Sequence, residues 1–158
     1  MKVGTDAVLL GCLCSAASPL WALDIGTGSG LIALQLAQRF EQCQIHAVEI
    51  DPHATLQAAE NFKKSHWSDR LQAIHADIRD WKSDFLYDLV VCNPPFYPTS
   101  HPAKGQTRQR AREQRDLRYE DLAKQMAAHL SDAGSAWCIL PAAFEKTWLD
   151  ALAQAKIH

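Results

Sequence analysis

The feature that most constrains this fold is a glycine-rich turn between a short apolar run and a segment of helical periodicity. The turn reads Asp24-Ile-Gly-Thr-Gly-Ser-Gly30. A short run over 20–25, apolar except for Asp24, leads into it, and apolar side chains recur at helical spacing over 31–40 after it. Glycines allow positive φ and close approach of a ligand to the backbone. The pattern therefore predicts a strand, a tight ligand-accessible loop and a helix.

The strand and helix unit recurs along the chain. Further strands are expected at 44–50, 71–76, 87–92 and 134–140, and further helices at 54–64 (with Pro52 at the start), 119–130 and 142–155. Strands that alternate with helices imply right-handed crossovers and a mostly parallel sheet with helices on both faces. We therefore expect one α/β domain over 1–158. Ligands of such sheets bind beyond the carboxyl ends of the strands, at the switch point, where 24–30 would lie.

Composition narrows the partners but does not identify one. The chain has 158 residues, of which 47% are hydrophobic and 22% charged, as in a globular domain with a real core. The formal net charge is −2, so contact with nucleic acid would need a local basic patch. The five cysteines are scattered through mostly apolar runs, which favours reduced core residues over a disulfide framework. No metal site is expected.

The first residues mimic a secretory signal, because Lys2 precedes the apolar stretch 8–17. Asp6 and the shortness of that stretch argue against this interpretation. No run approaches the roughly 18 apolar residues that a membrane span needs. We expect no membrane association, and the cytoplasm is the expected compartment.

The glycine spacing separates two cofactor classes. A dinucleotide fingerprint, G-x-G-x-x-G, would need its third glycine where Leu31 stands. The spacing Asp-x-Gly-x-Gly-x-Gly instead resembles the first motif of the class I methyltransferases, which have a Rossmann-like fold. The resemblance implies that Asp24, Gly26, Gly28 and Gly30 bind S-adenosyl-L-methionine, with S-adenosyl-L-homocysteine as the product. An acidic residue also suits a cofactor with a cationic amino-acid end.

Two further strand ends are expected to contact this cofactor. Glu49 ends the second strand, where an acid accepts hydrogen bonds from ribose hydroxyls, and its neighbour Ile50 is expected beside the cofactor. The alternative for Glu49, and more so for Asp51, is a solvated strand end. Asp77 and Ile78 resemble the adenine-binding position of the family, where a carboxylate accepts from the amino group and the apolar side chain packs on the ring.

A second loop carries the expected chemistry. The segment Asn93-Pro94-Pro95-Phe96 follows the fourth strand, and its prolines belong beyond the sheet, in a stiff loop. Carbonyl oxygens there can accept hydrogen bonds from an amine, and the target base can stack on the Phe96 ring. The loop resembles the fourth motif of methyltransferases that act on adenine N6, cytosine N4, guanine N2 or a glutamine amide. These four residues are the predicted catalytic residues, and Asn93 is also expected to contact the cofactor.

The opening stretch, 1–11, closely resembles the bacterial tRNA adenine N6-methyltransferases that modify the adenine just 3′ of the anticodon in valine tRNA. The runs Asn61-Phe62 with Trp67, and 76–78 with Trp81, are similar to that family too. The resemblance implies that Lys2, Thr5 and Asp6 lie near the methionine end of the cofactor. A helix N-cap at Thr5 or Asp6, before a helix from Ala7, is an equal alternative.

A long loop between Phe96 and Arg118 supports an RNA partner. Residues 104–118 include six basic and two acidic residues, which gives this segment a net charge of +4. Arg108, Arg110 and Arg112 are the expected phosphate contacts beside the flipped base. The alternative is a solvated charged loop.

Competing hypotheses remain open at this point. They are a guanine N2-methyltransferase of ribosomal RNA, a glutamine N5-methyltransferase of release factors, a nicotinamide-dependent oxidoreductase and a non-catalytic RNA-binding subunit.

The family sheet closes with a C-terminal strand hairpin, which would begin near His158, and the family has residues before the opening motif. The chain is therefore expected to be truncated at both ends, and its oligomeric state is left open.

Overall fold

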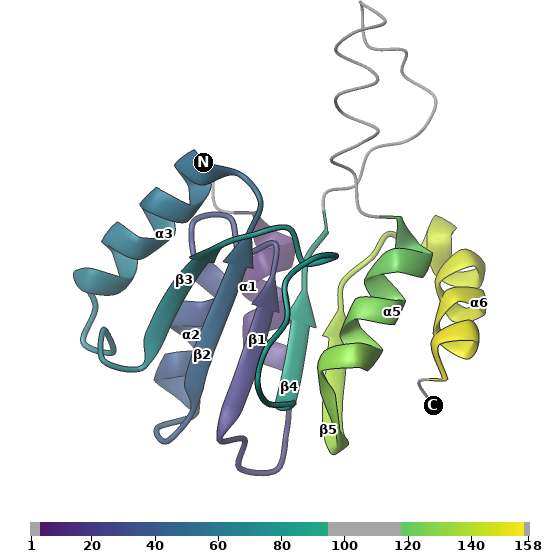
Figure 1. The fold of residues 1–158 in the computed structure, drawn as a ribbon, viewed down its shortest axis with the longest axis horizontal. Coiled ribbons are helices and arrows are strands. Elements are labelled where there is room, and N and C mark those ends of the chain that lie inside the picture. Colours follow the sequence, from purple (N-terminus) through teal and green to yellow (C-terminus); the bar gives the residue numbers. More distant parts are fainter. Residues whose placement is uncertain (1–3, 95–117, 157–158) are drawn as a thin grey trace, which may run out of the picture.

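The computed structural model describes residues 4–94 and 118–156, and within them a five-stranded parallel sheet forms the centre of the molecule (Figure 1). Its strands are β1 (Trp21–Ile25), β2 (Gln44–Glu49), β3 (Leu71–His75), β4 (Tyr87–Cys92) and β5 (Leu130–Cys138), in the spatial order β3-β2-β1-β4-β5. The order reverses between β1 and β4, which is the switch point of the sheet. The predicted α/β class is confirmed.

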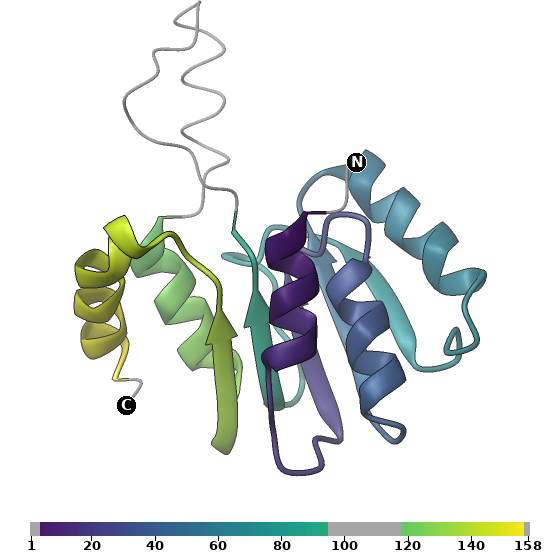
Figure 2. The same ribbon diagram turned by 180° about the vertical axis from the view of Figure 1, so that it is seen from behind.

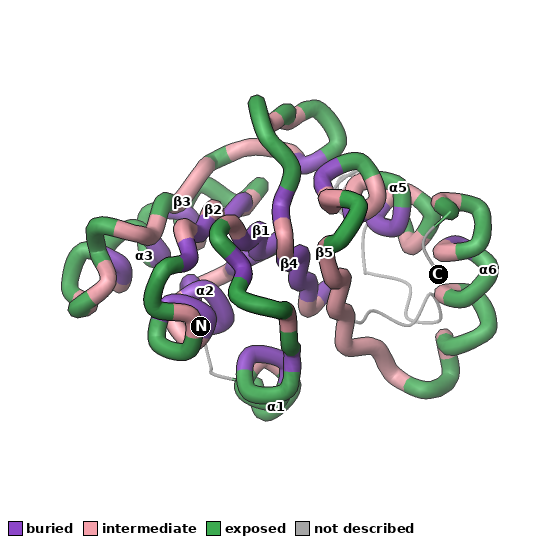
Figure 3. Tube along the Cα trace, turned by 90° about the horizontal axis from the view of Figure 1, so that it is seen from below, coloured by how far each residue is buried: buried purple, intermediate pink, exposed green. Residues whose placement is uncertain are grey.

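Helices cover both faces of the sheet because its central strands, β1, β2 and β4, bury side chains on both sides. Residues Ala22, Ile45 and Val91 point into one core with α1 (Thr5–Leu13), α2 (Leu31–Arg39) and α3 (Pro52–Lys63). Their neighbours, such as Leu23 and Val90, point into a second core with α5 (Tyr119–His129) and the flank of α6 (Glu145–Ala155). This alternation follows from the two-residue period of a strand. Figure 2 shows α1 and α2 on the face opposite α5, and Figure 3 shows buried residues in the central strands, whereas the edge strands β3 and β5 are only partly buried.

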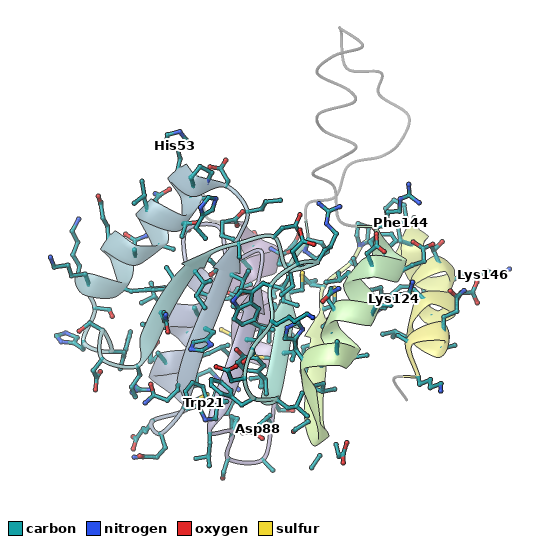
Figure 4. All side chains as sticks on the ribbon, viewed as in Figure 1. Trp21, His53, Asp88, Lys124, Phe144 and Lys146 are labelled. Atoms are coloured by element: carbon teal, nitrogen blue, oxygen red, sulfur yellow. The ribbon has the colours of Figure 1, made fainter. Side chains whose placement is uncertain are left out.

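Long-range hydrogen bonds fasten the end of the sheet that is remote from the glycine loop. The Asp88 carboxylate accepts from Leu20 N at 2.8 Å and Trp21 N at 3.1 Å, which ties the start of β1 to β4. The Arg70 guanidinium donates to three carbonyls around the end of α2, those of Ala37, Phe40 and Cys43. Trp21 and Asp88 lie at the lower end of the sheet in Figure 4.

Two predicted boundaries are wrong. Strand β5 begins at Leu130, directly after α5, and not at 134, because its backbone already pairs with Tyr87 there and continues through an irregularity before Ser135 pairs with Leu89. The polar stretch 131–134 gives no strand pattern in the sequence. Helix α1 begins at Thr5 with Gly4 as its N-cap residue and without a side-chain cap, so the capping alternative for Thr5 and Asp6 is wrong.

No helix within 4–94 and 118–156 is both long and apolar enough to span a membrane. A short 3-10 turn, η1 (Ala142–Phe144), precedes α6.

Candidate active site

Strand register brings the motifs of the sequence to one edge of the sheet. Ile25 pairs with Val48 on one side and with Cys92 on the other, and Glu49 pairs with His75. The glycine loop, Glu49 and Asn93 therefore leave neighbouring strands at the same level, with Asp77 just beyond β3. Adjacent strands lie about 4.8 Å apart, so these groups form one row along the carboxyl edge.

The glycine loop is held by hydrogen bonds that leave its outer surface open. Gly26 N and Thr27 N both donate to Val48 O, at 2.9 and 3.2 Å, which joins the loop to β2. Asn61 Nδ2 donates to Ser29 O at 2.9 Å from α3. The three glycines adopt positive φ, of +70°, +58° and +84° in chain order. Contacts from β2 and α3 thus help to fix the shape of the loop.

The glycines at 26 and 30 are required for different reasons. A Cβ on Gly30 would lie 2.4 Å from Phe62 Cε1 in the core, whereas a Cβ on Gly26 would meet no atom within 4 Å. Gly30 is therefore needed for packing of α2 against α3, and Gly26 borders open space where a ligand can approach.

We expect Gly30→Ala to lower the free energy of unfolding by about 2–5 kcal/mol, from left-handed strain and overpacking against Phe62. The control Gly26→Ala carries similar strain without the clash and should cost only about 1–2 kcal/mol. Urea unfolding of the two variants measures the difference. Equal losses would show that the Phe62 contact does not govern this position.

Asp24 is the most deeply buried acid of the site. Its side chain is 0% exposed, and Oδ2 accepts from Thr27 Oγ at 2.6 Å and from Ala33 N at 3.2 Å. Among the described residues no donor reaches Oδ1, which is also buried. Burial raises the pKa of this carboxyl to about 6, and the nearby Glu49 charge adds to the effect. A cationic group at this position would satisfy both the orphaned oxygen and the buried charge.

Glu49 faces the glycine loop and keeps capacity for a ligand. Its Oε2 accepts from Gly28 N at 2.9 Å and its Oε1 from Asp51 N at 3.0 Å. A carboxylate oxygen has two lone pairs, so each can accept one further hydrogen bond. Ile50, which follows, is 38% exposed at this edge. Asp51 caps α3 by accepting from His53 N at 2.8 Å, which is a structural role.

At the third strand end, Asp77 is engaged by its neighbour two residues on. Arg79 forms an ion pair with Asp77, and this pairing holds the pKa of the carboxyl below its usual value. Ile78 is only 6% exposed and packs in the second core, so its side chain offers little surface to a ligand. Sequence reasoning assigned no role to Arg79, Thr27 or Asn61. Two signals were available, the charge of Arg79 opposite that of Asp77 and the family resemblance of the Asn61-Phe62 run.

The remaining predicted residues are only partly described. Asn93 is half-buried directly after β4, and Pro94 is buried. Thr5 and Asp6 are exposed in the first turn of α1, whose start lies near the carboxyl edge of the sheet (Figure 2). The predicted roles of Lys2, Pro95, Phe96, Arg108, Arg110 and Arg112 concern positions outside the described residues. Within the described ranges, no three His, Cys, Asp or Glu side chains gather as a metal site would require.

Comparison with known proteins identifies the family of this fold and site. The family model described as "Methyltransferase small domain" matches residues 3–144. The chain belongs to the methyltransferase small domain family. The matched residues include both the row of acids at the carboxyl edge of the sheet and Asn93.

Two similar curated proteins carry the same name. A "tRNA1(Val) (adenine(37)-N6)-methyltransferase" of Flavobacterium psychrophilum is 44% identical over 144 residues, covering 89% of this chain and 62% of that protein. One of Klebsiella pneumoniae is 41% identical, covering 89% of this chain and 59% of that protein. The resemblance predicted from the opening motif is confirmed. The chain spans about 60% of the length of these relatives.

Solved structures agree on the fold. A SAM-dependent O-methyltransferase of Thermotoga maritima superposes with a TM-score of 0.71 at 14% identity, covering 98% of this chain and 51% of that one. At this identity the likeness concerns the fold alone. The Rossmann-like arrangement predicted from the glycine turn is confirmed.

Proposed function

We propose that this methyltransferase small domain transfers a methyl group from S-adenosyl-L-methionine to the exocyclic N6 amino group of an adenine in tRNA. The observation that carries the proposal is the pairing of Ile25 with Cys92, which puts the glycine loop and Asn93 side by side at the switch point. A cofactor held by the first loop would present its methyl group toward an acceptor held by the second. The names of the relatives point to adenine 37 of valine tRNA as that acceptor.

The row of groups along the carboxyl edge suits each part of this cofactor. Asp24, with its orphaned Oδ1, matches the cationic amino-acid end. Glu49 can accept from the ribose hydroxyls, and Asp77 lies beyond it for the adenine amino group. The open space over Gly26 admits the cofactor close to the backbone. When bound, the cofactor supplies a methyl group on a positively charged sulfonium, which is a strong electrophile.

Asn93 prepares the acceptor. The lone pair of an exocyclic amine is conjugated with its ring, and it must be freed before the nitrogen can attack. In this proposal the Asn93 carboxamide oxygen and the Pro94 carbonyl oxygen would each accept a hydrogen bond from the amine and hold its nitrogen in a near-attack position. Orientation of this kind supplies much of the rate enhancement, so no strong base is required. Phe96 would stack on the adenine ring.

Transfer of a tritiated methyl group to total tRNA, followed by nucleoside analysis, tests this proposal. N6-Methyladenosine is the expected product. N2-Methylguanosine would assign the site to the guanine N2 class, and label only in release factors would assign it to glutamine. Binding of tRNA without label in any product would support a non-catalytic RNA-binding subunit.

The arginine-rich loop is expected to hold the phosphates of the tRNA. We expect the triple replacement of Arg108, Arg110 and Arg112 by glutamine to weaken tRNA binding and to flatten its salt dependence by up to about three counterions. Replacing Lys63, an exposed lysine at the end of α3, serves as the control for loss of positive charge. A salt slope equal to that of the wild type would mean that the loop is merely a solvated charged segment.

A further inference from the structure

The contacts around Asp77 show a carboxylate that is already fully occupied. Arg79 N donates to Oδ1 at 3.0 Å, and Arg79 Nε reaches Oδ1 at 2.9 Å and Oδ2 at 3.0 Å. Arg79 Nη2 also donates to Oδ2. A carboxylate offers about four lone-pair sites on its two oxygens. One residue thus makes four contacts to the group that the proposed function reserves for adenine.

The turn that carries Arg79 is anchored, so the guanidinium cannot leave by movement of the whole segment at low cost. Asp80 N and Trp81 N donate to Asp77 O at 3.0 and 2.9 Å. The Trp81 ring stacks on His129 with centroids 5.3 Å apart and planes at 11°. These contacts keep the Arg79 backbone beside Asp77. Rotation of the long arginine side chain is the simple way to uncover the carboxylate.

Other acids can receive the guanidinium once it has rotated. The Asp77 contact is the main cause of the raised pKa of Arg79, and the Asp121 and Asp80 charges raise it further. Asp121 stands in the first turn of α5, and its charge acts on Arg79 although the two residues are far apart in the sequence. Displacement therefore does not leave the arginine charge without compensation. Since the Arg79 and Asp77 side chains are 34% and 22% exposed, the pair is also weakened by solvent.

We propose that Arg79 is an internal competitor for the adenine-binding carboxylate, so that Asp77 accepts the amino group of the cofactor only after the guanidinium has moved aside. This inference rests on the proposed function, because it takes Asp77 as the adenine contact. Arg79 is then a specificity-determining residue. A ligand gains a hydrogen bond to Asp77 only if it carries a donor, such as the adenine amino group, that can replace the N–H groups of Arg79.

Calorimetric titration of S-adenosyl-L-homocysteine tests the proposal without measuring activity. Arg79→Gln is expected to bind this ligand about two- to fivefold more tightly, the range that an exposed ion pair typically contributes. An analogue whose purine lacks the 6-amino group should bind the variant and the wild type equally, because it gains nothing from a freed Asp77. Lys82→Gln, which removes an exposed positive charge from the same loop, should match the wild type for both ligands.

Two further measurements separate competition from a structural role. Arg79→Lys keeps the charge but not the planar fork, and its affinity should lie between those of the wild type and Arg79→Gln. The advantage of Arg79→Gln should also shrink at high ionic strength, where screening weakens the pair in the wild type. Equal or weaker binding of S-adenosyl-L-homocysteine by Arg79→Gln, or equal tightening for both ligands, would overturn the proposal. If the wild type binds neither ligand, the assignment of S-adenosyl-L-methionine as the cofactor is wrong. The proposed competition between Arg79 and the cofactor for Asp77 would then be wrong too.

Discussion

Replacing Asn93 with alanine should reduce methyl transfer by about 10²- to 10³-fold and leave the affinity for S-adenosyl-L-homocysteine within about twofold of the wild type. The magnitude is that of removing one preorganised hydrogen-bonding group from a reacting centre. Cofactor affinity is expected to survive because the bonds that hold the glycine loop, from Gly26 and Thr27 to Val48 and from Asn61 to Ser29, do not involve Asn93. Single-turnover transfer to tRNA and calorimetric titration measure the two effects.

A conservative variant sharpens this experiment. Asn93→Asp keeps an acceptor oxygen at the same place and should retain more transfer than Asn93→Ala. Pro94 should not be used as the control, because it is itself assigned to the acceptor loop. Undiminished turnover by Asn93→Ala would show that Asn93 has no role in methyl transfer. The pairing of β1 with β4 would then say nothing about function.

Replacing Asp24 with asparagine should weaken binding of S-adenosyl-L-homocysteine by about 10- to 100-fold, the range for loss of a hydrogen bond to a charged group. Asparagine has the same shape, and its carbonyl oxygen can keep the bonds from Thr27 Oγ and Ala33 N. Only the charge opposite the amino-acid end is lost. 5′-Methylthioadenosine has no amino-acid end, so the variant should bind it as the wild type does. Equal weakening for both ligands would contradict this role.

The same substitution should change how stability depends on pH. The Asp24 pKa is about 6 in the folded protein against an ordinary value of 3.8, so the folded state holds this proton more tightly. The Asp24 contribution to the free energy of unfolding therefore falls as pH rises from about 4 to 6, and above pH 6 the full cost is present. That cost is about 3 kcal/mol.

Asp24→Asn should remove this slope, which urea unfolding of the ligand-free protein between pH 4 and 7 measures. At pH 7 the variant should be as stable as the wild type or up to about 2 kcal/mol more stable, because the unpaired amide N–H offsets part of the gain. A slope that persists in Asp24→Asn would assign the titration to another group.

The sequence was most informative where a pattern is local. The glycine turn, the apolar strands and the acids at strand ends lie within a few residues of the elements that position them, so period and spacing predict both the parallel sheet and the carboxyl-edge row. The adjacency of the loops at Gly26 and Asn93 was not predicted, because parallel strands joined by crossovers share one carboxyl edge but their order along it is known only from the structure.

The features that sequence reasoning missed depend on contacts between distant residues. The clamp of Arg70 on the end of α2 and the bond from Leu20 to Asp88 join residues 27–68 positions apart, and no period marks them. Gly30 was assigned to the cofactor, yet its closest constraint is the Phe62 ring of α3. The early start of β5 arises from backbone pairing with Tyr87, which polar side chains at 131–134 do not reveal.

Methyl transfer to valine tRNA with adenine or guanine at position 37 tests the central claim most directly. If Asn93 presents the N6 amine to a cofactor held by the glycine loop, the tRNA with adenine 37 should acquire one tritiated methyl group as N6-methyladenosine, and the tRNA with guanine 37 should acquire none. Equal labelling of both tRNAs, or label recovered in any nucleoside other than N6-methyladenosine, would contradict the account.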